Sequence, residues 1–130
     1  MEQDIMVYLA KATESLQTAE SEFANGRYNS CANRCYYACF QAAIAALLRE
    51  GIHSRGQWSH EIVQSQFVGV LINQRKRYDR ELRRVLANNQ ILRDQADYRA
   101  ELVTATQASR ALRRSRLFIN AIRQRGGVAQ

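Results

Sequence analysis

Residues 31–48 read CANRCYYACFQAAIAALL, a stretch that is apolar on almost every side of a helix and rich in alanine and cysteine. A helix that is apolar all round has to be covered by other elements on every side. We therefore expect residues 28–50 to form the central helix of a bundle, with small side chains that let neighbouring backbones approach. Gly51 is expected to end it.

The segments on either side carry apolar residues at spacings of three and four, which place one apolar stripe on each helix. The sequence predicts a first helix that ends at Asn25-Gly26 and a third that follows an N-cap at Ser59 and reaches about residue 72. A fourth is predicted over about residues 78–92 and a last over about residues 99–124. The absence of proline argues against a turn-rich β fold. The prediction is an all-α, up-and-down four-helix bundle with one additional short helix.

The length of 130 residues suits one domain, which we expect over residues 1–125, with a frayed tail at residues 126–130. The acidic N-terminus does not have the pattern of a secretory signal. The longest apolar stretch, residues 35–48, is too short to span a bilayer. Three cysteines, an odd number, indicate free thiols in a reducing compartment. These features predict a cytoplasmic protein that is not bound to a membrane.

Positive charge is concentrated in the second half of the chain. The whole chain carries 19 basic and 12 acidic residues, a net charge of +7, whereas residues 1–60 sum to −1. Nearly all the basic residues are arginine, whose planar fork of donors suits phosphate and carboxylate groups. The asymmetry indicates an anionic partner, either nucleic acid or an acidic protein. A solvated basic surface without a ligand is the alternative.

The cysteines are spaced by four residues along the central helix, at Cys31, Cys35 and Cys39. A tight thiolate site normally draws its ligands from more than one element. We therefore expect them to be small buried apolar side chains. No metal site and no cofactor is predicted.

Three pieces of the sequence resemble the HEPN superfamily, small helical bundles named for higher eukaryote and prokaryote nucleotide binding. Residues 24–43, ANGRYNSCANRCYYACFQAA, are similar to its central helix pair. His60 followed by Phe67-Val68 resembles its third helix, and residues 92–98, LRDQADY, resemble an element that precedes its last helix. The resemblance covers roughly residues 5–123 and is closest to the short, single-domain prokaryotic branch associated with toxin–antitoxin pairs.

The resemblance implies a homodimer, in many members a metal-independent ribonuclease, and in many small members a minimal nucleotidyltransferase encoded as partner. Ribonuclease members carry an arginine and, after four to six intervening residues, a histidine. The matching arginine here is Arg93, and Tyr98, Arg99 and Ala100 stand where that histidine would be. Metal-free RNA cleavage benefits from a group that moves protons near neutral pH, which tyrosine does poorly unless its pKa is strongly shifted.

The candidates for a catalytic role are Arg93, Asp97, Tyr98 and His60. Each has a structural alternative. Asp97 would cap the start of the final helix or pair with an arginine, and Tyr98 would place its ring in the core with its hydroxyl at the rim. His60 would bond to backbone near a helix start, or would face the same cleft as Arg93.

Tyr36 and Tyr37 point about 100° apart on their helix, so both cannot enter one core groove. One is expected to pack inside. The other, with Asn33 and Arg34, would line a dimer seam or a ligand cleft, or would simply pack.

Eight arginines are candidates for RNA or nucleotide binding, and we expect the separated ones to converge on one electropositive groove beside the turn that precedes the last helix. They are Arg34, Arg77, Arg80, Arg84, Arg93, Arg110, Arg113 and Arg114. Clusters of this kind suffice for phosphate binding without base readout.

The sequence thus predicts a binding component that engages RNA, a nucleotide or a partner nucleotidyltransferase within a toxin–antitoxin or defence module. A divergent metal-independent ribonuclease toxin is the alternative, and a purely structural dimer or adaptor is the third.

Overall fold

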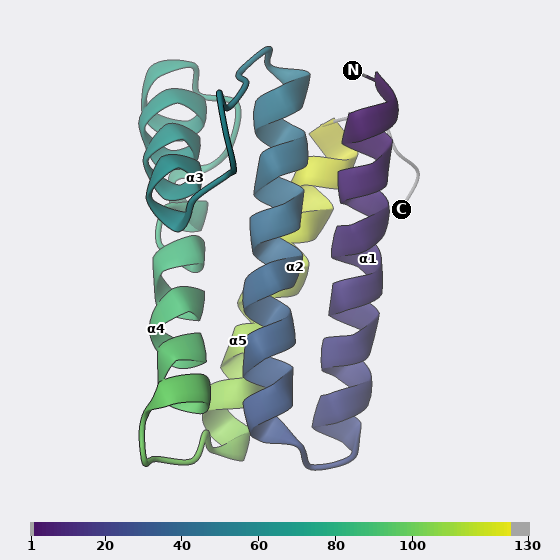
Figure 1. Cartoon of the computed structure of the whole chain (residues 1–130), viewed down its shortest axis with the longest axis vertical. Helices are drawn as coiled ribbons and strands as arrows, with labels where there is room; N and C mark the ends of the chain where they lie inside the picture. The colour runs from purple at the N-terminus through teal and green to yellow at the C-terminus, as the bar shows by residue number, and fades with distance from the viewer. Residues whose placement is uncertain (1, 126–130) are drawn as a thin grey trace.

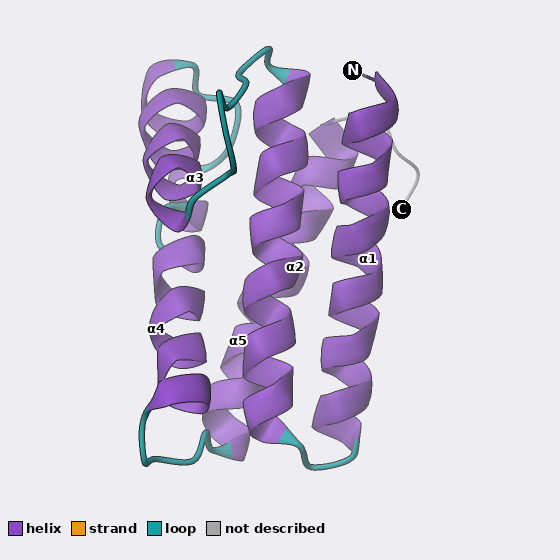
Figure 2. Ribbon diagram, viewed as in Figure 1, coloured by secondary structure: helices purple, strands orange, loops and turns teal. Residues whose placement is uncertain are grey.

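The computed structural model describes residues 2–125, and all of its regular elements are helical (Figures 1 and 2). In chain order these are α1 (Glu2–Ala24), α2 (Tyr28–Arg49), α3 (His60–Gln66), the π-helical η1 (Phe67–Gln74), the 3₁₀ turn η2 (Arg80–Leu82), α4 (Val85–Tyr98) and α5 (Ala105–Arg125). No strand occurs in this part of the chain, so the all-α prediction is confirmed. The tail predicted at residues 126–130 lies outside the described residues.

The central position predicted for α2 is confirmed. Figure 1 shows α1 and α2 side by side as an antiparallel hairpin, α5 behind α2, and α3 stacked above α4 on the other side. The α2 helix packs against α1, α4, α5 and α3, whereas α1 also packs against α5. Four long helices with one short helix, α3, therefore form the bundle.

Small side chains make the close packing around α2 possible. Burial is complete or nearly complete at nine of its alanines and cysteines, Cys31, Ala32, Cys35, Ala38, Cys39, Ala42, Ala43, Ala45 and Ala46. All three cysteines are free, and burial raises the pKa of Cys39 to about 12, so its thiol is inert near neutral pH. The cysteines therefore fill the core, as predicted.

The predicted ends of the first helices are also confirmed. The α1 helix ends at Ala24, and Gly26 takes a left-handed φ of 74° that glycine adopts without strain. The Arg27 amide donates to the Glu22 carbonyl at 2.8 Å, which closes the turn. At the start of α3, the Ser59 hydroxyl accepts a hydrogen bond from the Ile62 amide at 3.1 Å.

The third segment is helical from His60 to Gln74, close to the predicted end near residue 72, but from Phe67 onward it has π geometry. The bounds predicted for the fourth and last helices are wrong. The fourth helix begins at Val85 instead of residue 78, because Asp79 caps a separate 3₁₀ turn through the Glu81 amide, and it continues to Tyr98.

The last helix begins at Ala105 instead of residue 99, because Thr104 and Gln107 form a capping box. The Thr104 hydroxyl accepts from the Gln107 amide at 3.1 Å, while the Gln107 side-chain oxygen accepts from the Thr104 amide at 3.0 Å. This signal is present in the sequence as Thr-x-x-Gln. The 92–98 element forms the end of α4 and precedes the last helix, as the resemblance implied.

A buried polar side chain fixes α4 against α2 and α5. Asn89, 1% exposed, donates to the Ser115 hydroxyl at 2.9 Å and to the Cys35 carbonyl at 3.4 Å. Its oxygen accepts from Nε of Arg114 at 2.6 Å. Because a buried polar group loses free energy when it is left unpaired, these bonds select one register of the three helices.

We predict that Asn89→Ala lowers the free energy of unfolding by about 2–3 kcal/mol, since it removes the buried amide and leaves Ser115 and Arg114 without this partner. Urea unfolding measures the change. The exposed neighbour Asn88 supplies the control, because Asn88→Ala should stay within about 0.5 kcal/mol of the wild type. Equal effects of the two substitutions would show that the buried network contributes nothing specific.

Candidate functional site

Arg93 stands near the end of α4 with its guanidinium enclosed by tyrosines. Its side chain is only 10% exposed. The guanidinium carbon lies 5.3 Å from the ring centroid of Tyr36, 5.6 Å from that of Tyr37 and 5.5 Å from that of Tyr98. Such contacts stabilise a cation over aromatic rings. A cation at this depth is unusual for a helical bundle and marks the place as a candidate site.

Hydrogen bonds fix the orientation of this guanidinium. Nε of Arg93 donates to a carboxylate oxygen of Asp97 at 3.3 Å, and Nη2 donates to the hydroxyl of Tyr98 at 3.0 Å. The same oxygen of Asp97 accepts from the Asn33 amide at 2.9 Å. Arg34 donates twice to the Asn33 oxygen, at 3.0 and 2.8 Å. We refer to Asn33, Arg34, Arg93, Asp97 and Tyr98 as the Arg93 network.

Arg93 remains charged in this environment. Burial alone would lower its pKa, but the hydrogen bond to Tyr98, the electrostatic interaction with Tyr37 and the hydrogen bond to Asp97 together outweigh burial, and the pKa is raised. In the described part of the chain, Nη1 makes no hydrogen bond. The fork therefore keeps donors that an anionic oxygen can accept.

Two structural alternatives for this element are wrong. Asp97 does not cap the final helix, because it lies in the last turn of α4; the pairing with an arginine is the alternative that the structure confirms. The ring of Tyr98 is not in the core, since this residue is 71% exposed. Its hydroxyl points inward to Arg93.

His60, the first residue of α3, belongs to the same aromatic cluster. Its ring centroid lies 5.2 Å from that of Tyr36 and 5.5 Å from that of Phe40. Nδ1 is buried and makes no hydrogen bond within the described chain, so the backbone-bonded alternative is wrong. Burial, and after it the charge of Arg93, lowers the pKa of His60, which keeps the imidazole neutral at neutral pH.

Arg93 and His60 both contact Tyr36, and Asp97 and Tyr98 join them through hydrogen bonds from Arg93. Tyr36, 1% exposed, is the residue of the Tyr36–Tyr37 pair that packs inside, and its hydroxyl is buried without a hydrogen-bond partner among the described residues. Tyr37 is half-buried and lies between Arg34 and Arg93, with the Arg34 guanidinium carbon 5.2 Å from its ring centroid. The sequence left the choice between Tyr36 and Tyr37 open.

A hollow of about 410 Å³ lies near the start of α1, and a second of about 290 Å³ borders the Arg93 network. The second is lined by polar side chains, namely Thr18, Glu22, Asn29, Ser30, Asn33, Arg34 and Asp97. Sequence reasoning missed Asn29, whose side-chain oxygen accepts from the Val103 amide at 3.0 Å. This bond connects the turn between α4 and α5 to α2 beside the site. No local sequence pattern predicts it, because the two residues are far apart in the chain.

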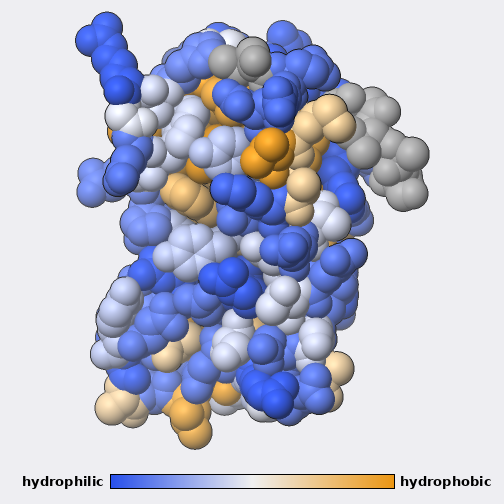
Figure 3. All heavy atoms as spheres, turned by 45° about the vertical axis from the view of Figure 1, so that its right-hand side comes forward, coloured by the Kyte–Doolittle hydropathy of each residue, from blue (hydrophilic) through white to orange (hydrophobic). Residues whose placement is uncertain are grey.

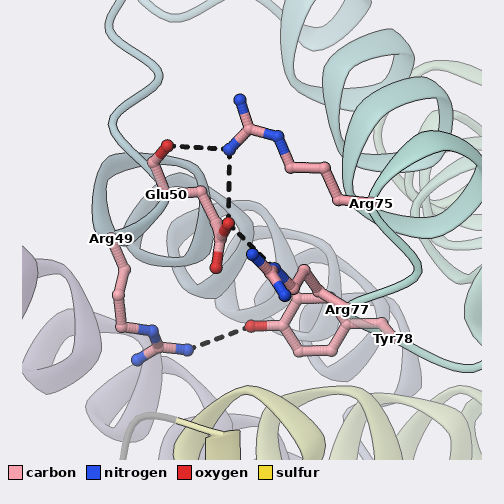
Figure 4. Close-up of polar contacts among 5 residues, drawn as sticks. All are labelled: Arg49, Glu50, Arg75, Arg77 and Tyr78. Carbon is pink, nitrogen blue, oxygen red and sulfur yellow. Dashed lines mark hydrogen bonds and ion pairs between the residues drawn. The ribbon is translucent and has the colours of Figure 1, made fainter.

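The candidate arginines do not converge on one groove. Arg77 lies at the other end of α2, where its Nε donates to Glu50 at 3.1 Å and Arg75 joins the same carboxylate at 3.2 Å (Figure 4). The hydrogen bonds from these two arginines outweigh burial, which alone would raise the pKa of Glu50, and lower that pKa. Glu50 is separated from Tyr37 by about 20 Å of helix. Arg77 and Arg93 therefore occupy different ends of the bundle.

The remaining candidate arginines form two groups. Two lie between α4 and α5, and three are exposed to solvent. Arg110 and Arg114 line a hollow of about 230 Å³ between these helices. Burial lowers the pKa of Arg114, whose Nε is held by Asn89. Arg80, Arg84 and Arg113 are exposed. The face seen in Figure 3 is mainly hydrophilic, with hydrophobic surface confined to small areas.

Residues 2–125 contain neither a candidate metal site nor a candidate membrane-spanning helix. No group of three or more histidine, cysteine, aspartate or glutamate side chains in that range could hold a metal ion. None of the described helices combines the length and the apolar character needed to cross a bilayer.

We predict that Arg93→Gln raises the pKa of His60 part of the way toward its ordinary value, because it removes a neighbouring positive charge but leaves burial in place. Because the folded-state pKa is the lower one, protonation favours the unfolded chain, and stability falls as the pH drops through about 6.5. An NMR titration of the imidazole measures the pKa. Arg34→Gln is the control and should leave it in place; a His60 pKa that ignores Arg93 would contradict the proximity of the two groups.

Comparison with known proteins agrees with this architecture. A family model described as HEPN domain matches residues 5–125. A protein of Methanocaldococcus jannaschii named "Putative toxin MJ0605" is 27% identical over 123 residues, which cover 94% of this chain and 88% of that protein. A bundle built around an apolar second helix, matched by the family model over nearly its whole length, identifies the chain as a member of the HEPN family.

Proposed function

We propose that the protein is an RNA-binding component of a toxin–antitoxin pair, and that the Arg93 network binds a phosphate of the RNA backbone. The observation that carries this proposal is the oriented charge of Arg93. Two of its nitrogens are held by Asp97 and Tyr98, while Nη1 is left without a partner among the described residues. A guanidinium fixed in this way loses little conformational entropy when it binds a phosphate oxygen.

The toxin–antitoxin context rests on family membership and on the name of the Methanocaldococcus relative. A homodimer and a minimal nucleotidyltransferase partner belong to the same proposal. The acid-free α5, with its six arginines, supplies further positive charge for a polyanion.

We predict that a labelled single-stranded RNA of about 20 nucleotides binds in about 50 mM salt and is largely released by about 0.3 M, as multiple phosphate contacts require. Arg93→Gln should weaken binding about tenfold, because it removes a charge-assisted hydrogen bond. The affinity of Arg93→Lys should lie between those of wild type and Arg93→Gln. Fluorescence anisotropy measures each affinity.

Arg55→Gln is the matched control, since it removes the same charge from an exposed loop position. It should change the affinity by less than about threefold. If Arg55→Gln and Arg93→Gln lowered the RNA affinity equally, the loss would come from net charge and not from a site at Arg93. An RNA affinity that does not change with salt would contradict binding through phosphate contacts.

A second function, a divergent metal-independent ribonuclease, is favoured by one observation: neutral His60 and charged Arg93 contact the same ring of Tyr36. In such an enzyme, His60 would accept the proton of a ribose 2′-hydroxyl as its oxygen attacks phosphorus. Arg93 would stabilise the negative charge that develops on the phosphate oxygens. The hydroxyl of Tyr98 would donate its proton to the departing 5′-oxygen.

The ribonuclease candidate predicts cleavage of RNA by the purified protein in the presence of a metal chelator. His60→Gln and Arg93→Gln would each reduce the rate at least about 100-fold, since each removes one contribution to the transition state. Gel analysis of the products measures the rate. If the RNA stays full-length after prolonged incubation with wild type under conditions where it binds, the ribonuclease candidate is refuted and only the binding role remains.

A further inference from the structure

Tyr98 combines exposure with a fixed position, which is uncommon for an aromatic side chain. It is 71% exposed, yet its hydroxyl accepts a hydrogen bond of 3.0 Å from buried Arg93. No other aromatic ring of the described chain contacts it. The ring is thus anchored at its polar end, and at least one of its faces is open to solvent.

Two apolar side chains in the same part of the chain are similarly exposed. Leu102, in the turn after α4, is 78% exposed, and Ile91 is 67% exposed. Ile91 precedes Tyr98 by seven residues, so the two lie on the same face of α4. Exposed apolar side chains along one face indicate a surface that a ligand or partner covers.

The distance from Arg93 to this ring suits one nucleotide. The guanidinium carbon lies 5.5 Å from the ring centroid. In a nucleotide, a single sugar joins the phosphate to the base. A phosphate bound at Arg93 therefore leaves a base of the same strand within reach of Tyr98.

We infer that Tyr98 is a specificity-determining residue whose ring is the stacking platform for an unpaired base, with the phosphate of the adjoining backbone on Arg93. This inference rests on the proposed RNA binding and adds the requirement for a single strand. In a duplex, each base is already stacked and paired, so its face is not available to the protein. An unpaired base has a free face, and stacking tolerates any of the bases.

The test compares wild type with Tyr98→Ala, Tyr98→Phe and Tyr98→Trp on a labelled single-stranded RNA and on the same RNA annealed to its complement. Wild type should prefer the single strand. Tyr98→Ala should lose about 5- to 100-fold in affinity for the single strand and much less for the duplex, so that the preference disappears. Tyr98→Phe and Tyr98→Trp keep a ring and should keep the preference.

Two controls separate stacking from other roles of Tyr98. Tyr98→Phe removes only the hydroxyl that anchors Arg93; a loss as large as that of Tyr98→Ala would assign the effect to the anchor and overturn the inference. Met6→Ala removes an exposed apolar side chain from the start of α1, outside the Arg93 network, and should leave the preference for the single strand unchanged.

The oligomeric state of each variant, measured by light scattering after gel filtration, completes the test. A change of oligomeric state in Tyr98→Ala without a loss of RNA affinity would identify the ring as an interface residue and overturn the inference. Wild type that binds neither RNA would refute the proposed function itself. RNA binding that depends on Arg93 but not on Tyr98 would refute only the stacking role.

Discussion

Covering an apolar helix on every side is the constraint that organises this bundle. The α2 helix buries a nearly continuous run of alanine, cysteine and large aliphatic side chains, and water would otherwise meet it on all faces. Its neighbours α1, α4 and α5 supply that cover. Because most of the contacting residues of α2 are small, the helices approach closely, and their relative register is set by a few larger or polar groups such as Asn89.

The same constraint creates the candidate site. Near its N-terminal end α2 carries polar residues, Asn33 and Arg34, at a level where α4 ends and the turn to α5 leaves the bundle. The Arg93 side chain extends from α4 toward this end of α2, where it is held between the tyrosines of α2 and the carboxylate of Asp97. Enclosure strengthens the interactions of its charge, and the hydrogen bonds prevent the loss of that charge. The lowered pKa of His60 is a consequence of the same arrangement.

Net charge alone is a poor guide to where an anion binds in this protein. The second half of the chain is strongly basic, but its arginines serve different purposes. Glu50 holds Arg75 and Arg77 at one end of the bundle, and Arg49 donates to the hydroxyl of Tyr78 (Figure 4). Arg49 also donates to the Ile122 carbonyl. These contacts fix the segment before η2 to the ends of α2 and α5, which is a structural role. Arg93 differs because it is buried, oriented and still has donors to offer.

The sequence by itself determined the all-α class, the central helix, the turn at Asn25-Gly26 and the cap at Ser59, because these follow from local periodicity and local hydrogen bonds. The motif at residues 92–98 also singled out Arg93, Asp97 and Tyr98. The start of α5 was also encoded locally, by the capping box of Thr104 and Gln107, but the spacing of apolar residues placed the start of the helix too early. Only the tertiary structure decided that His60 lies against Tyr36, that Asn33 binds Asp97 and that the ring of Tyr98 faces solvent. Each of these depends on how side chains from helices far apart in the chain pack around α2, and packing of that kind leaves no local pattern.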